Sequence, residues 1–159
     1  MADELLAVAS ASLRGGADGV VDALASVLES AAPFESGEVA LEASGSWKRW
    51  SLRPGRLNVA DDTLLQWLSQ RDTVVSFEDL AEEPSGQSAQ LPSRTALLGA
   101  GVRALLAYPL DSAGGARGAV VLCHGHAWAF AGESRHRAER AVALAGICLA
   151  LLLERARPD

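Results

Sequence analysis

The chain is poor in cysteine, in net positive charge and in long apolar runs, and each shortage argues against a class of protein. Its 159 residues include two cysteines, Cys123 and Cys148, which are too few for the disulfide framework of a small secreted domain and fit a reducing cytoplasm. The net charge of −6 argues against the basic surface that nucleic acid requires. The longest apolar run, residues 141–153, would form a helix of ~20 Å, shorter than the ~30 Å hydrocarbon core of a membrane. We therefore expect a cytoplasmic, globular protein that contacts neither nucleic acid nor membrane.

The length and the order of the periodic segments predict a single domain over residues 1–159, with its core at about 18–155. Residues 1–17 are expected to form an N-terminal helix, and a second helix follows with Asp18 as its N-cap. A long helix is predicted over residues 132–157.

The long terminal helix is apolar on two adjacent faces between residues 141 and 153. Such a helix should be buried on more than one side. One side can cover a sheet, and the other needs the N-terminal helices or another subunit.

The middle of the chain changes to the period of strands. Residues 36–44 alternate, with apolar residues on one face and the carboxylates Glu38 and Glu42 on the other, which we expect to be solvated. A partner strand at 47–54 follows a hairpin turn at Gly45-Ser46. The remaining predictions are a helix at 60–72 capped by Asp61 or Asp62, a strand at 73–77, a loop at 82–93, a helical turn at 94–101, and paired strands at 102–110 and 117–126. The polar loop at 82–93 is either a plain surface loop or a lid over a pocket.

The C-terminal half, from Gly101 to Arg155, resembles that of a GAF domain. The features that carry the resemblance are a strand ending in Pro-Leu, a glycine-containing turn, a second apolar strand, a phenylalanine after a short link, and a closing amphipathic helix. Here these are Pro109-Leu110, Gly114-Gly115, Gly118-Ala119-Val120-Val121, Phe130 and the helix from Glu133. The order and length of elements match over nearly all of residues 3–157.

The resemblance implies an α+β fold with a central antiparallel sheet. The first, second and last helices would cover one face, and a small-molecule pocket would lie on the other. Family members act mostly as regulatory or sensory modules of bacterial signalling proteins, and they commonly dimerise through their first and last helices. A PAS-like fold is the alternative, but the two leading helices and the long closing helix weigh against it.

The residues that mark known ligands of this family are missing. The chain has one asparagine, Asn58, and one lysine, Lys48, and they do not match the set found in cyclic-nucleotide GAF domains. Cys148 falls within the apolar helix rather than in a pocket loop, where a bilin-binding cysteine would be expected. No cofactor is therefore predicted, and an unidentified small molecule stays open as the ligand.

The stretch Cys123-His124-Gly125-His126 is the most conspicuous cluster of chemically active side chains. On a regular strand the cysteine faces one way and both histidines the other, so the three cannot converge on one ion unless the strand breaks at Gly125. The interpretations are the polar end of a buried strand, which we favour, a His124 that lines a ligand pocket, and a metal site that would require this break in the strand.

Four further residues are candidates for a ligand site. Tyr108 and Arg103 lie on the strand before the hairpin, where Tyr108 can also be core and Arg103 can either anchor an anion or face water. Trp50 and Trp67 would flank the pocket that the resemblance implies, or fill the core. The candidate ligand-binding residues are therefore Trp50, Trp67, Arg103, Tyr108 and His124.

No serine or cysteine lies in a nucleophile context such as Gly-x-Ser-x-Gly, so we predict no enzyme. The sequence predicts a regulatory or sensory domain of a bacterial signalling or transcription-regulatory protein, forming a homodimer through its N- and C-terminal helices and acting on a downstream output domain. The alternative is a structural dimerisation module whose pocket is filled by its own side chains.

Overall fold

A computed structural model describes residues 15–43, 45–53, 60–82, 90–111, 117–130, 132 and 134–155, together with Ser10. The predicted N-terminal helix lies almost entirely outside these residues. The elements in chain order are α2 (Gly16–Ala31), β1 (Ser36–Ala43), β2 (Ser46–Ser51), α3 (Asp62–Ser69), β3 (Val75–Phe77), α4 (Arg94–Gly99), β4 (Ala104–Asp111), β5 (Arg117–His124), the 3-10 helix η2 (Ser134–Ala138) and α5 (Glu139–Arg155).

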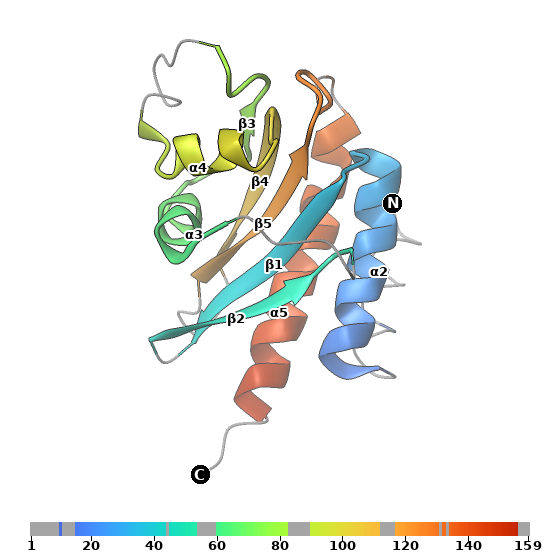
Figure 1. Ribbon diagram of the computed structural model, residues 1–159. Helices are drawn as coiled ribbons and strands as arrows, with labels where there is room; N and C mark the ends of the chain where they lie inside the picture. The colour runs from blue at the N-terminus through green and yellow to red at the C-terminus, as the bar shows by residue number, and fades with distance from the viewer. Residues whose placement is uncertain are drawn as a thin grey trace.

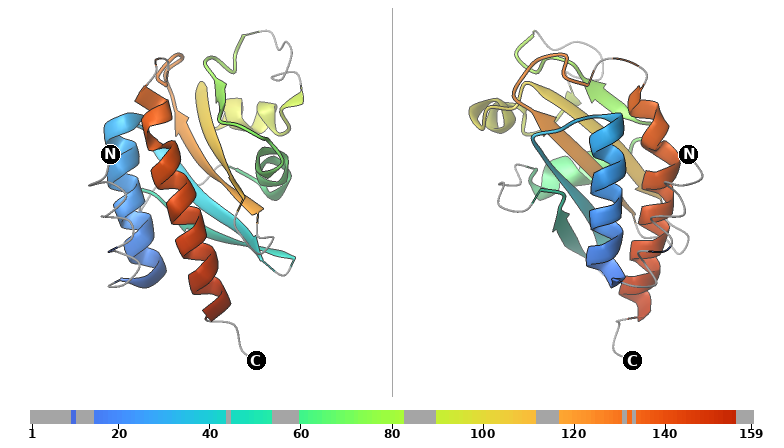
Figure 2. Two further views of the ribbon diagram at one scale, coloured as in Figure 1. Left: turned by 180° about the vertical axis from the view of Figure 1, so that it is seen from behind. Right: turned by 90° about the vertical axis from the view of Figure 1, so that its right-hand side faces the viewer.

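The strands form one antiparallel sheet in the order β2-β1-β5-β4-β3. The long helices α2 and α5 lie side by side over one face of this sheet, and the short helices α3 and α4 lie on the other (Figures 1 and 2). This arrangement confirms the predicted α+β fold with the second and last helices on one face.

The sheet separates two apolar clusters because successive side chains of a strand point to opposite faces. On β5, Val120 and Leu122 face α2 and α5, whereas Val121 and Cys123 face α3 and α4. Cys123 therefore shares a face of β5 with Val121.

One prediction for β1 is wrong. Glu38 is 2% exposed rather than solvated, because α3 and the segment before it cover that face of the sheet. The Arg49 guanidinium on β2 binds both oxygens of the Glu38 carboxylate at 2.7 Å and also donates to the Ala60 carbonyl at 2.5 Å. A buried carboxylate is tolerated here because it has a charged, hydrogen-bonded partner. Glu42, further along β1, is exposed as predicted.

The helix starts also refine the sequence predictions. α2 begins at Gly16 and not after Asp18, which lies in the first turn and does not cap the helix. At α3 the choice falls on Asp61, whose Oδ1 accepts a hydrogen bond from the Leu64 backbone N–H at 2.8 Å.

The terminal helix is shorter than predicted, since η2 precedes it and α5 begins only at Glu139. Its inner side is buried against the sheet and α2 through Ala141, Val142, Ala145 and Leu149. The second apolar side is not covered by the described part of the chain, and Ile147 and Leu151 are 42% and 55% exposed. None of the helices in the described residues is long and apolar enough to cross a membrane.

Candidate functional site

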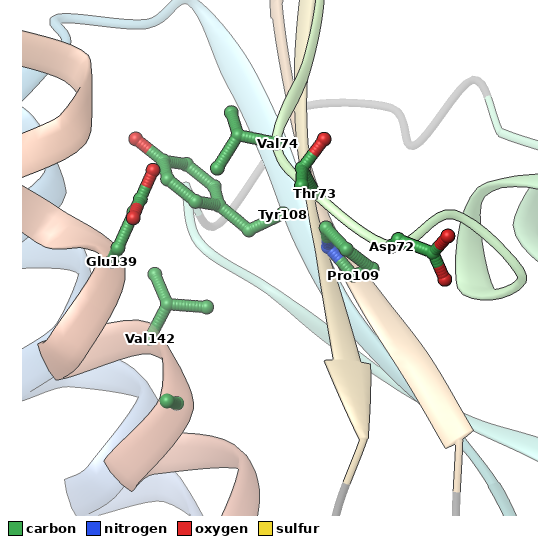
Figure 3. A pocket seen from close by; sticks show the side chains of 8 residues that line it. Asp72, Thr73, Val74, Tyr108, Pro109, Glu139 and Val142 are labelled. Atoms are coloured by element: carbon green, nitrogen blue, oxygen red, sulfur yellow. The ribbon is translucent and has the colours of Figure 1, made fainter.

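A pocket of about 240 Å³ lies between β4 and the first turns of α5. One wall is formed by β4, the second by α5, and the third by residues 72–74, which lead into β3 (Figure 3). The lining residues are Asp72, Thr73, Val74, Tyr108, Pro109, Glu139, Val142 and Ala143.

The pocket exists because β3 is too short to cover the edge of β4. The pairing of the two strands ends at Val75 with Ala107, so Tyr108 and Pro109 lie beyond the last β3 partner. A proline has no backbone N–H and suits such an uncovered edge position. Residues 72–74 instead pass beside this edge and line the pocket.

The pocket combines an apolar interior with an acidic side chain, Glu139, at its rim. The Tyr108 side chain is 2% exposed and extends from β4 towards α5, with its hydroxyl end on the side of Glu139 (Figure 3). The Glu139 carboxylate lies 2.8 Å from Nδ1 of His136, and both side chains are about half exposed. Asp72 and Thr73 are exposed on the opposite rim, where the Asp72 carboxylate points away from Tyr108 and Glu139 (Figure 3). A small ligand with an apolar body and a cationic or hydrogen-bond-donating group would match these walls.

Of the five residues predicted to bind a ligand, only Tyr108 lines this pocket. Trp50 is on the same face of the sheet, because it pairs with Val39, and it packs at the edge of the α2/α5 cluster. His124 is also on this face, at the end of β5, where its ring meets Phe130 edge-on at 6.1 Å and its Nδ1 lies 3.5 Å from Glu35.

The other two candidates lie on the α3/α4 face. Trp67 packs against Phe77, and the Arg71 guanidinium lies 4.3 Å from the ring centroid of Trp67. Arg103 forms a two-pronged ion pair with Asp79, with both contacts at 2.8 Å. This hydrogen-bonded pairing raises the pKa of Arg103 and lowers the pKa of Asp79. The structure therefore does not bring the five predicted residues together at one site.

The cysteine and the histidines of residues 123–126 are also separated. Cys123 is 3% exposed in the α3/α4 cluster, and burial raises the pKa of its thiol to about 12. The His124 and His126 rings lie together at 5.4 Å between centroids, and Nδ1 of His124 accepts the His126 backbone N–H at 3.0 Å. Within the described ranges no group of three or more His, Cys, Asp or Glu side chains could hold a metal ion.

On the α3/α4 face, where the resemblance places a ligand, the described residues pack as an apolar cluster. Leu64, Leu65, Leu68, Leu97 and Leu105 are each at most 1% exposed. Polar contacts surround this cluster. The Ser93 hydroxyl donates to Asp61 at 2.6 Å and, with the Leu64 N–H, lowers the pKa of that carboxyl. Most of the segment predicted as a surface loop or a lid, residues 83–89 of 82–93, lies outside the described residues.

Sequence reasoning missed most of the pocket. Glu139 was within the predicted terminal helix, but nothing in its spacing marked it as a pocket residue. The signal that could have located the site is Pro109, because a proline beside a short neighbouring strand indicates an uncovered sheet edge.

The fold is shared with solved sensor domains. The structure matches the GAF domain of a two-component sensor histidine kinase from Bacillus halodurans with a TM-score of 0.68 and 11% identity, over 88% of this chain and 97% of that one. It matches the chromophore-binding domain of a bacteriophytochrome from R. palustris with a TM-score of 0.66 and 11% identity, over 96% of this chain. It also matches the photosensory core module of a Stigmatella aurantiaca phytochrome with a TM-score of 0.58 and 14% identity, again over 96% of this chain.

The chain spans 62% of the R. palustris protein chain and 36% of the Stigmatella one. No protein-family model and no curated protein matches its sequence. The structural matches establish that the chain has a GAF-like fold, as its sequence predicted.

Proposed function

We propose that this chain is a non-catalytic sensory or regulatory module of a bacterial signalling protein, located in the cytoplasm. A small molecule would bind in the pocket beside α5, and α5 would relay the bound state to an output domain. The observation that carries the proposal is that the pocket has one wall on the sheet, at Tyr108, and another on α5, at Glu139 and Val142. Any occupant would touch both.

A ligand in this position can shift α5 only if it binds one placement of the helix more tightly than another. The contact between α5 and the sheet is apolar, through residues such as Val142, Ala145 and Leu149. Apolar contacts have little directional preference, so small shifts of the helix along the sheet are less restricted than shifts of a bidentate ion pair. This supports α5 as the element that responds.

The same proposal includes a homodimer. Ile147 and Leu151 are exposed one turn apart on the outer side of α5, and Leu144 and Cys148 beside them are half-buried. A surface of this kind is covered at low cost by a second copy of itself, in an interface with twofold symmetry.

The ligand is tested first on the purified chain. Native mass spectrometry and an absorbance spectrum detect any molecule that it retains. Thermal unfolding is then followed with benzylamine, choline and putrescine as cationic probes, because the rim is acidic. A probe at 100 times its dissociation constant stabilises the fold by about 2.7 kcal/mol. For a domain of this size that raises Tm by roughly 5–10 °C.

Matched variants locate the binding. Thr73→Trp fills the pocket from its rim and should abolish the shift, whereas Thr63→Trp, at an exposed threonine on α3, should retain it. Glu139→Gln should weaken binding of the cations, and Glu42→Gln, at an exposed carboxylate on β1, should leave it unchanged. A shift that survives Thr73→Trp would contradict the proposed pocket.

The second candidate function is a structural dimerisation module without a ligand. It is supported by the close packing of the leucines on the α3/α4 face, where the resemblance places a ligand. A dimer that retains no molecule and whose Tm no probe raises would support this candidate over the sensor.

A further inference from the structure

The outer side of α5 carries a stripe of five exposed residues whose positions are spaced symmetrically about the central one. In order they are Arg140, Ala143, Ile147, Leu151 and Glu154, and we call them the outer stripe. Their spacing of three and four residues keeps them on one face of the helix. Ile147 is seven residues from each charged end and four residues from both Ala143 and Leu151.

The two halves of the outer stripe are complementary rather than identical. A basic residue, Arg140, lies opposite an acidic one, Glu154, and a small residue, Ala143, lies opposite a large one, Leu151. The half-buried residues beside the stripe repeat the pattern, with Leu144 and Ala150 each three residues from Ile147.

Two copies of this helix fit when they run in opposite directions. If a twofold axis passes beside Ile147, Arg140 of one chain meets the partner's Glu154, and Leu151 meets the partner's Ala143. Each ion pair and each large-to-small contact then occurs twice, because the interface is isologous. Opposite charges attract across the helix pair, and a small residue leaves room for the leucine.

Two copies that run in the same direction fit less well. Arg140 would then face the partner's Arg140, and Glu154 the partner's Glu154, so both ends would bring like charges together. Leu151 would face the partner's Leu151, while Ala143 would face another alanine and leave the contact underfilled.

We propose that the chain dimerises through antiparallel packing of α5 against the partner's α5, with the twofold axis at Ile147. The proposal rests on the homodimer of the proposed function and adds its orientation. The helix segment from Arg140 to Glu154 is ~21 Å long, so the interface is small and the dimer should be weak and reversible. The C-terminal ends of the two α5 helices lie at opposite ends of the pair, so each chain passes its signal to its own output domain.

Disulfide trapping distinguishes the two orientations. In a Cys148→Ser background, the variants Ala143→Cys and Leu151→Cys are made separately and carry different affinity tags. Copper-phenanthroline oxidation of their mixture should link one tag to the other, because residue 143 meets the partner's residue 151. Oxidation of Ala143→Cys alone should give little covalent dimer. Efficient linkage of Ala143→Cys to itself, without the mixed product, would overturn the antiparallel arrangement.

A charge exchange tests the same geometry without cysteines. Arg140→Glu should weaken self-association about tenfold in sedimentation equilibrium, because two attractive pairs become repulsive. The double variant Arg140→Glu/Glu154→Arg should restore it, since the pairs are exchanged but kept. Lys48→Glu, an equal charge change at an exposed position on β2, is the control and should have no effect.

The outcomes separate the two proposals. If the wild-type chain stays monomeric at every concentration, the homodimer itself is refuted. If it dimerises but the double variant associates no better than Arg140→Glu, the homodimer stands and the antiparallel orientation is wrong. Circular dichroism of each variant establishes that it is folded before its association is compared.

Discussion

The two faces of the sheet are held by different kinds of contact. On the α2/α5 face, two helices of 16 and 17 residues pack through aliphatic side chains. On the α3/α4 face, helices of eight and six residues cover a smaller area, and charged groups tie the surrounding segments together. These are the pairs of Glu38 with Arg49 and of Asp79 with Arg103.

The difference follows from the length of the helices. The long helices bury more apolar surface than the short ones, and around the short ones ion pairs between neighbouring segments add directional contacts. Ion pairs with two short hydrogen bonds set an orientation that aliphatic contacts leave adjustable. We therefore call the face of the sheet covered by α3 and α4 the fixed side, and the face covered by α2 and α5 the adjustable side.

The largest expected effect comes from breaking the buried pair on the fixed side. Arg49→Met leaves the Glu38 carboxylate without its charged partner in a position where it is 2% exposed. We expect the free energy of unfolding, measured by urea denaturation at pH 7, to fall by about 3 kcal/mol. The estimate is at the low end for buried pairs because the Arg49 side chain is 31% exposed.

Two controls sharpen this result. The double variant Glu38→Met/Arg49→Met removes the unpaired charge and should recover most of the loss. Arg53→Met breaks an ion pair with Glu29 whose partners are 40% and 46% exposed, and it should cost less than about 1 kcal/mol. Equal losses in Arg49→Met and Arg53→Met would mean that burial of the pair contributes nothing, and the contrast between the faces would fail.

The sequence predicted the order of elements well and the environment of some side chains poorly. The alternation in residues 36–44 correctly located β1 and separated its two faces. It could not show that the face bearing Glu38 would be covered, because that depends on α3 and on Arg49 from the next strand. Periodicity describes which residues share a face, and only the packed fold determines which faces are solvated.

The next effect concerns the start of α3. Asp61 caps this helix and accepts the Ser93 hydroxyl, so it joins α3 to the segment before α4. Asp61→Ala should lower the free energy of unfolding by about 1 kcal/mol at pH 7. Asp62→Ala is the matched control, since Asp62 is the exposed neighbour in the first turn, and it should change stability less.

The acid dependence of the Asp61 variant has a definite sign. The hydrogen bonds from Ser93 and Leu64 lower the pKa of Asp61 in the folded state. The stability that its charge contributes is therefore fully present above its unfolded pKa of about 3.9, and it is lost as pH falls through the lower folded value. The gap between wild type and Asp61→Ala should narrow in that range. A gap that widens on acidification would contradict this role of the carboxylate.

The candidate site was less predictable than the fold for a related reason. The pocket depends on where β3 stops relative to Tyr108, and strand ends are poorly marked in the sequence. Tyr108 was identified from its own chemistry. Glu139 and Asp72 were not, because only the tertiary packing of α5 against the edge of the sheet places them on opposite rims of one pocket.

The last prediction leaves stability unchanged and compares the two faces directly through the reactivity of their cysteines, because each face has one. Cys123 is buried on the fixed side, where burial raises the pKa of its thiol to about 12, so the thiol is protonated at pH 8. Cys148 is half-buried on α5. Iodoacetamide at pH 8 should modify Cys148 in the native protein and leave Cys123 unmodified, as counted by mass spectrometry. The Cys148→Ser variant should show no labelling under native conditions. In urea, both Cys123 and Cys148 of the wild type should react. Rapid native labelling of Cys123 would mean that the cover of α3 and α4 opens more readily than the ion pairs beside it imply, and the contrast between the two faces would fail.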